Sequence, residues 1–131
     1  MSSKEREAKR AVEYLNRLLH EAVEAGADTV ELERVPGGLE ICFLAGGTGL
    51  GTVLQDRTLE AELVELIVHR AGLEWVGKAS HGAMNWGIGG KDFRIAVEEY
   101  DSFDESCFRL KLGKDRRRST RNARESQRRK T

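Results

Sequence analysis

Residues 29–45 read TVELERVPGGLEICFLA, and this stretch decides the fold. In its first part Val30 and Leu32 alternate with polar residues, which is the pattern of a strand with one buried face. The PGG that follows is typical of a turn, and LEICFLA returns as a second apolar strand. The stretch therefore predicts a β-hairpin with strands over residues 29–35 and 39–45.

One helix is expected before this hairpin and one after it. Ahead of it, Ser2-x-x-Glu5 matches a capping box, and apolar residues then recur at helical spacing until Gly26 provides a stop. A second helix is expected from about Thr58 to Ala71, with leucines on one face and a glycine directly after it.

The part of the chain after the second helix is rich in strand patterns. HGAMNWGIGG indicates a strand that leads into a Gly89-Gly90 turn, and KDFRIAVEEY and SCFRLKL indicate two more strands around a turn at residues 101–105. Ahead of the second helix, GTVLQD is compatible with a brief strand or a turn. The predicted order is α-β-β-α-β-β-β. This is an α+β fold, a mostly antiparallel sheet with two helices packed on it.

Length and composition indicate one globular domain. The chain has 131 residues, of which 39% are hydrophobic and 34% are charged. Its apolar runs are far shorter than the roughly 20 residues of a membrane span, and its charged start, MSSKEREAKR, does not resemble a signal peptide. Cys42 and Cys107 have apolar neighbours and are too few for a disulfide framework. We expect reduced thiols and a cytoplasmic protein.

The net charge of zero hides a basic end. Residues 1–113 hold 13 basic and 20 acidic residues, whereas residues 114–131 hold nine basic residues and two acidic ones. The basic residues are Lys114, Arg116, Arg117, Arg118, Arg121, Arg124, Arg128, Arg129 and Lys130. This segment lacks large apolar side chains, so we expect a disordered tail that follows a folded domain over residues 1–113. Such a tail is either a solubilising end or a binding element for nucleic acid, an anionic surface or an acidic protein.

The run GGTGLGTV, from Gly46 to Val53, resembles a phosphate-binding loop at first sight. However, Thr52 and Val53 stand where the P-loop pattern requires Lys and Ser or Thr, and no helix follows at once. The run also fails the dinucleotide-binding fingerprint in spacing and context. The favoured interpretation is a structural turn. The alternative is an anion nest formed by backbone amides, with the candidate glycines Gly46, Gly47, Gly49 and Gly51.

Several short segments, in this order, resemble the second N-terminal domain of the type II secretion and type IV pilus assembly ATPases, a PAS-like α+β domain. The matching segments are EAVEAGADTVELE (Glu21–Glu33), FLAG (Phe43–Gly46), the helix Thr58–Ala71, SHG (Ser80–Gly82), GGKDFRIAV (Gly89–Val97) and DESCFRLKL (Asp104–Leu112). The resemblance covers roughly residues 11–113. It implies a domain that in the full-length ATPases precedes a RecA-like motor.

The resemblance singles out Arg94 and Arg109, which keep the separation of the family's two strand arginines. In the family these arginines reach towards nucleotide phosphates bound in the motor, and a planar, permanently charged guanidinium suits such contacts. The alternative is a pair of surface arginines bridged to nearby carboxylates such as Glu98, Glu99, Asp92 or Asp104.

The chain also departs from the family pattern. Thr29 and Glu31 replace the Asp and His of the opening motif, and Phe43-Leu44-Ala45 replaces an Arg-Ile-Asp. Only the basic tail follows Leu112, without the Walker A lysine, Walker B carboxylates or metal ligands of a motor. The family mechanism of ATP hydrolysis therefore has no residues to carry it in this sequence.

Other chemistry is weakly signalled. His20, His69 and His81 are dispersed and no zinc-ligand spacing occurs, so no metal site and no cofactor is expected. Ser80-His81 is not a nucleophile–base arrangement, because such groups meet across space rather than along the chain. Trp75 and Trp86 are interpreted as core or sheet-edge residues rather than base-stacking platforms.

The sequence thus predicts a non-catalytic binding or regulatory module. Its expected partner is a protein, and the resemblance implies a secretion or pilus ATPase. The alternative function is nucleic-acid association through the basic tail, with an affinity that falls steeply with salt. An ATP-binding enzyme is the least favoured hypothesis.

Overall fold

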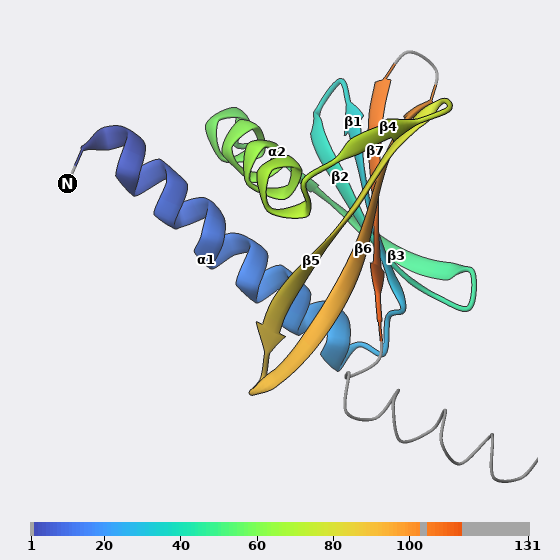
Figure 1. Cartoon of the computed structure of the whole chain (residues 1–131). Helices are drawn as coiled ribbons and strands as arrows, with labels where there is room; N and C mark the ends of the chain where they lie inside the picture. The colour runs from blue at the N-terminus through green and yellow to red at the C-terminus, as the bar shows by residue number, and fades with distance from the viewer. Residues whose placement is uncertain (1, 103–104, 114–131) are drawn as a thin grey trace, which may run out of the picture.

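The computed structural model describes residues 2–102 and 105–113, and it shows an α+β protein with two helices and one seven-stranded antiparallel sheet (Figure 1). The predicted class is confirmed. The predictions for Asp104 and for the tail from Lys114 onwards lie outside the described residues. The elements are α1 (Ser3–Glu24), β1 (Thr29–Val35), β2 (Gly38–Ala45), β3 (Thr48–Leu54), α2 (Arg57–Ala71), β4 (Glu74–Val76), β5 (Ala79–Ile88), β6 (Lys91–Ser102) and β7 (Glu105–Leu112).

The helix ends follow the capping chemistry of the sequence. Ser2 caps α1, because its hydroxyl accepts a hydrogen bond from the backbone N–H of Glu5 at 3.1 Å. Asp56 caps α2 in the same way through the N–H of Leu59 at 3.0 Å. Gly72 ends α2 in the left-handed conformation, with φ +58°. Both predicted helices are confirmed within a residue or two.

The sheet consists of two meanders that meet in its middle. The strand order is β3-β2-β1-β7-β6-β5-β4, so the first and last strands are neighbours. β1 pairs with β7 over five residue pairs, from Thr29↔Lys111 to Glu33↔Cys107. All other neighbours are also neighbours in the sequence, and every pairing is antiparallel.

Two strands go beyond the five in the predicted order. The glycine run forms an edge strand, β3, after a two-residue Gly46-Gly47 turn. A brief strand or turn was expected in GTVLQD, and β3 is longer than that because it begins at Thr48. Both turn glycines have positive φ, +61° and +89°, as the twisted turn of a tight hairpin requires. β4 is a three-residue strand at the opposite edge. Neither strand has the alternating apolar pattern of a half-buried strand, because all but one of their residues are exposed.

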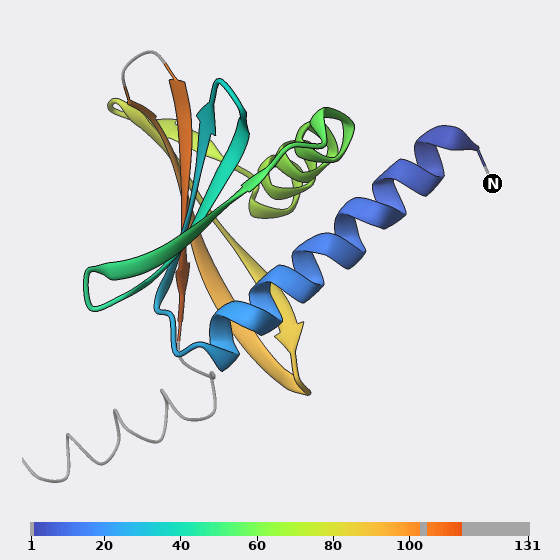
Figure 2. The same ribbon diagram turned by 180° about the vertical axis from the view of Figure 1, so that it is seen from behind.

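Both helices lie on the same face of the sheet, as opposite views show (Figures 1 and 2). The hydrophobic core fills the space between the two helices and the sheet. It is built from the inward residues of α1, α2 and five strands. A salt bridge of 2.8 Å joins Arg10 of α1 to the capping residue Asp56 of α2. Trp86, which is buried, donates its indole N–H to Asn16 of α1 at 3.1 Å. The packing leaves the other face of the sheet without a covering layer in the described part of the chain.

Candidate functional site

The face of the sheet opposite the two helices is called the open face here. On β1, Glu31 lies between the buried Val30 and Leu32 and therefore points to the open face. The same alternation on β7 turns Arg109 to the open face. Polar side chains thus collect on one side of the sheet and apolar ones under the helices.

The strand register aligns ionisable side chains of the open face in one line. The cross-strand pairs are Glu74↔His81, His81↔Glu98, Glu98↔Arg109 and Glu31↔Arg109. We call these five residues the charged row. It runs from the β4 edge to β1 across most of the sheet, and its three carboxylates alternate with the imidazole of His81 and the guanidinium of Arg109.

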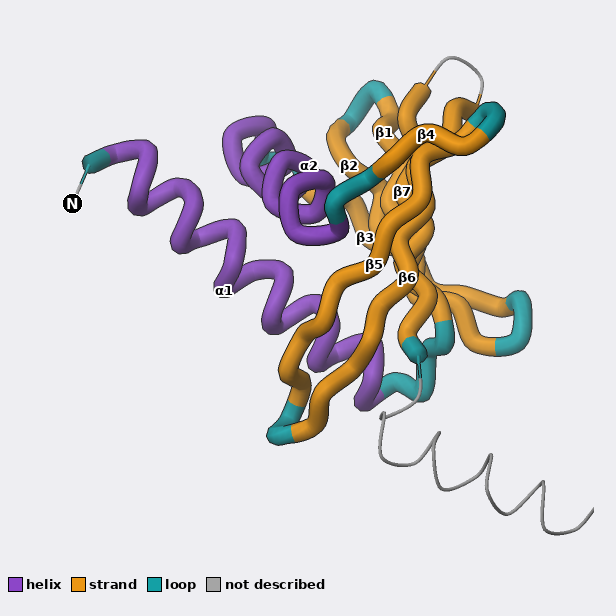
Figure 3. The backbone as a smooth tube through the Cα atoms, viewed as in Figure 1, coloured by secondary structure: helices purple, strands orange, loops and turns teal. Residues whose placement is uncertain are grey.

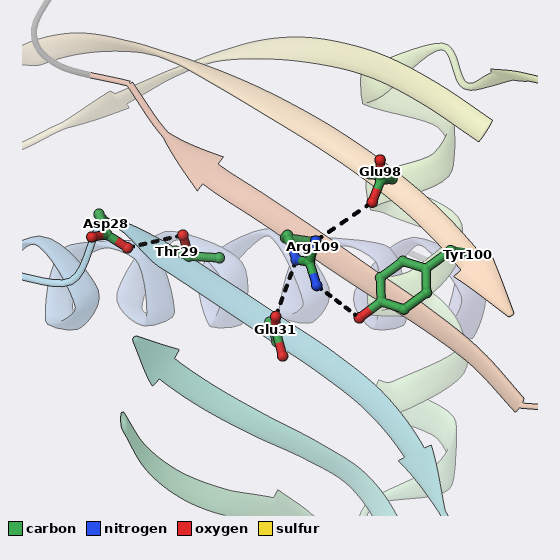
Figure 4. A network of polar contacts seen from close by, with 6 residues as sticks. All are labelled: Asp28, Thr29, Glu31, Glu98, Tyr100 and Arg109. Atoms are coloured by element: carbon green, nitrogen blue, oxygen red, sulfur yellow. Dashed lines mark hydrogen bonds and ion pairs between the residues drawn. The ribbon is translucent and has the colours of Figure 1, made fainter. Parts of the chain in front are cut away.

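Arg109 contacts two other members of the charged row, Glu31 and Glu98, and also Tyr100 (Figure 4). Its Nε donates a hydrogen bond to Oε1 of Glu31 at 3.0 Å, and its Nη1 lies 3.7 Å from Oε1 of Glu98. Its Nη2 donates to the hydroxyl of Tyr100 at 3.3 Å, and the guanidinium carbon lies 5.1 Å from the centre of that ring. Arg109 thus joins strands β1, β6 and β7 from one side chain.

These contacts set the electrostatics of the row. Burial alone would lower the pKa of Arg109, but the hydrogen bond to Glu31 and the neighbouring negative groups raise it above its ordinary value. Burial is the main cause that raises the pKa of Tyr100. The side chains of Arg109, Glu31 and Glu98 are 35%, 33% and 34% exposed. Their ion pairs are therefore only partly screened by water.

A hollow of about 230 Å³ lies beside the charged row on β5, β6 and β7. It exists because Ala96, which is exposed, has a short side chain among longer ones. Two cations, one carboxylate and one imidazole line it together with small residues. The lining residues are His81, Gly82, Ala96, Val97, Glu98, Arg109 and Lys111. Such mixed polarity suits a polar or charged side chain of a partner.

The structure separates the two predicted arginines. Arg94 of β6 lies on the same open face as Arg109, and its Nη1 donates to Asn85 at 3.4 Å. Arg94 is four residues along β6 from Glu98, the residue that pairs with Arg109, so the two arginines lie about 13 Å apart along the strand direction. They do not converge on one site in this arrangement. Arg109 fits the alternative interpretation of a surface arginine bridged to carboxylates. Its carboxylate partners are Glu98 and also Glu31.

The four candidate glycines of the anion nest are not gathered into one cradle. The amide of Gly46 donates to the carboxylate of Asp28 at 3.4 Å, and Asp28 also accepts from the hydroxyl of Thr29 at 2.9 Å (Figure 4). Gly47 completes the turn, while Gly49 and Gly51 lie within the edge strand. An acidic side chain already occupies the place of an anion at the turn.

The remaining candidate groups also stay apart. Ser80 is buried under the helices, whereas the adjacent His81 is exposed on the open face, so the two side chains point in opposite directions. Trp86 is buried and is a core residue. Trp75 is exposed on β4 and is a sheet-edge residue. Within residues 2–102 and 105–113, no three or more His, Cys, Asp or Glu side chains are grouped as metal ligands would be.

Sequence reasoning missed several members of the site, among them Glu31, Glu74, Tyr100 and Lys111. Lys111 could have been found from Arg109, because residues two apart on a strand share a face. Glu31 could not, because it is 78 positions away from Arg109 and only the β1–β7 pairing brings them together.

The sequence matches no known protein-family model and no curated protein. Neither of the described helices combines the length and the apolar character that a bilayer crossing requires.

Proposed function

We propose that this chain is a non-catalytic binding module that docks on a protein partner through the open face of its sheet. The observation that carries the proposal is the charged row, a line of carboxylates that alternate with an imidazole and a guanidinium on a sheet face that no described element covers. Complementary charges across an interface contribute mainly to specificity and to the rate of association. The ion pairs that Arg109 already makes with Glu31 and Glu98 limit the side-chain entropy that binding removes.

The hollow beside the row supplies a place for an anchoring group. A basic or amide side chain of the partner would meet Glu98, and a carboxylate would meet Lys111, which is exposed and has no salt bridge among the described residues. The partner surface would therefore carry charges of both signs. The resemblance to secretion and pilus ATPase domains makes such an ATPase the partner we put forward.

A charge reversal in the hollow tests this docking face. We would immobilise the full chain, Lys111→Glu and, as a matched control, Lys4→Glu on the exposed start of α1. Binding to a purified secretion or pilus ATPase is expected at micromolar concentration for the wild type and for Lys4→Glu, with at least a tenfold loss for Lys111→Glu. Equal binding by the two variants argues against the open face. No binding by any of them argues against the ATPase as partner.

Nucleic-acid association through the tail is the second candidate. It is favoured by the nine basic residues within residues 114–131. Filter binding to DNA and RNA, at low and at physiological salt, would compare the full chain with a chain that ends at residue 113. Salt-sensitive binding by the full chain alone supports this function, and its absence removes it.

We also propose that this chain does not bind or hydrolyse ATP. A calorimetric titration with ATP and Mg²⁺ is expected to show no binding, because the motif residues for phosphate and metal are missing from the glycine run. Tight binding of Mg²⁺-ATP would overturn the non-catalytic assignment.

A further inference from the structure

The edge strand β3 has the features of a strand that pairs with another chain. Among the described strands it lies at the end of the sheet and pairs only with β2, and the β2–β3 hairpin projects away from the body (Figure 3). From Ala45 to Gln55 no residue is charged, although 34% of the whole chain is. Natural edge strands are commonly protected by charges, prolines or bulges. β3 has none of these, and its register with β2 is continuous.

The outer backbone groups of β3 can be assigned from its hairpin. Ala45 and Thr48 flank a two-residue turn and therefore form a hydrogen-bonded pair. Hydrogen-bonded and non-hydrogen-bonded pairs alternate along an antiparallel ladder. The N–H and C=O groups of Gly49, Gly51 and Val53 consequently point away from β2. This set is symmetric about Gly51.

The side chains of β3 supply an apolar anchor and a place to receive one. Leu50, on the helix side of β3, is 85% exposed. A hollow of about 310 Å³ lies on the same side, between α1 and the hairpin, and Thr52 is at its rim. The hollow is lined by Tyr14, Arg17, Leu18, Glu21, Phe43 and Thr52.

We propose that β3 pairs antiparallel with β3 of a second copy of this chain, with the two-fold axis at Gly51. This register places Leu50 of each copy opposite Thr52 of the other, beside the hollow that Tyr14 and Phe43 line. It also places Val53, the bulkiest side chain on the other side of β3, opposite Gly49, which has none. The outward backbone groups then meet in three hydrogen-bonded pairs, and the two sheets become one.

The same features favour a second copy over an unrelated strand. An isologous contact requires that one surface carries both the knob and its hole, and β3 carries Leu50 next to the hollow at Thr52. The absence of charge from residues 45–55 removes the like-charge repulsion that self-association would otherwise meet. Because the paired segment is a single seven-residue strand on each copy, the dimer should be weak and dependent on concentration.

A matched pair of valine variants tests the proposal. Val53 on β3 and Val76 on β4 are both exposed edge-strand valines, at 42% and 68%. Sedimentation equilibrium of the full chain, from low micromolar to near-millimolar concentration, is expected to show a monomer–dimer equilibrium. Val53→Lys should weaken it at least tenfold and Val76→Lys should leave it within twofold, because only the former places two lysines in the interface. Circular dichroism checks that both variants are folded.

Amide hydrogen exchange by NMR gives a second readout within the wild type. At high concentration the amides of Gly49, Gly51 and Val53 should exchange at least tenfold more slowly than at low concentration. Those of Leu50 and Thr52, which bond to β2, should change little. A chain that stays monomeric throughout the concentration range overturns the proposal. So does a dimer that is insensitive to Val53→Lys, or a β3 edge that is protected only by an added extended peptide.

Discussion

Replacement of Arg109 by methionine tests whether the charged row stabilises the sheet. Methionine keeps most of the length of the side chain but removes the charge and all of its donors. The change would leave Glu31 and Glu98 facing one another across β7 without a cation between them, and it would leave the hydroxyl of Tyr100 without its guanidinium donor. We expect a destabilised but folded protein.

The expected size follows from the contacts. Each of the two ion pairs is about one third exposed, so solvent screening limits it to roughly 0.5 kcal/mol. The contact between the guanidinium and the ring of Tyr100 contributes about 0.5 kcal/mol. The total loss is therefore about 1.5 kcal/mol in the free energy of unfolding. For a domain of this size that corresponds to a fall of about 5 to 7 °C in Tm.

Equilibrium unfolding in urea, followed by circular dichroism, measures this loss. Arg94→Met is the matched control, because Arg94 lies on the same face but makes a hydrogen bond only to Asn85 among the described residues, and its expected change is within about 0.5 kcal/mol. The difference between Arg109→Met and wild type should shrink between about 0.1 and 1 M salt, because salt screens the charges involved. The reasoning is refuted if Arg109→Met unfolds within about 0.3 kcal/mol of Arg94→Met.

Three further predictions concern backbone and capping. Gly82→Ala should destabilise by about 1 to 3 kcal/mol in urea unfolding, because a Cβ there would lie 2.2 Å from the backbone oxygen of Ala71; a neutral change would contradict this contact. Gly47→Ala should lower the free energy of unfolding by about 1 kcal/mol in the same assay, because Gly47 has a φ of +89° that an alanine rarely adopts, although an added Cβ would meet no neighbouring atom. A change near zero would mean that the turn relaxes. The pKa of Asp56 is lowered, first by the N–H of Leu59, so its stabilising contribution is complete above about pH 4 and disappears as the pH falls below that. The Tm gap between wild type and Asp56→Ala should therefore close on acidification, and a constant gap would count against the cap.

The elements that could be predicted from sequence are those with local signals. Capping at Ser2, a stop at Gly72 and alternation in residues 29–35 each depend on neighbours in the chain, and each is confirmed. β3 was foreseen only as a brief strand or turn and β4 was missed, because an exposed edge strand needs no apolar alternation.

The site was less predictable for a physical reason. Alternation along β6 and β7 shows that Arg94 and Arg109 share a face, but not which residues of other strands stand beside them. That depends on register and strand order, which are long-range properties. The Arg109–Glu31 pair exists only because β7 inserts next to β1 rather than ending the sheet.

The neighbouring positions of β1 and β7 also govern the order of events during synthesis. Glu31 and Arg109 are 78 positions apart, so at about 5 to 20 residues per second β1 waits roughly 4 to 16 s for its partner strand. Throughout that interval the nascent chain has an unpaired strand edge with Val30 and Leu32 beside it. A ribosome that stalls before residue 105 therefore holds a nascent chain in which β1 lacks its β7 neighbour, and the yield of this protein in cells should depend on uninterrupted translation of β7.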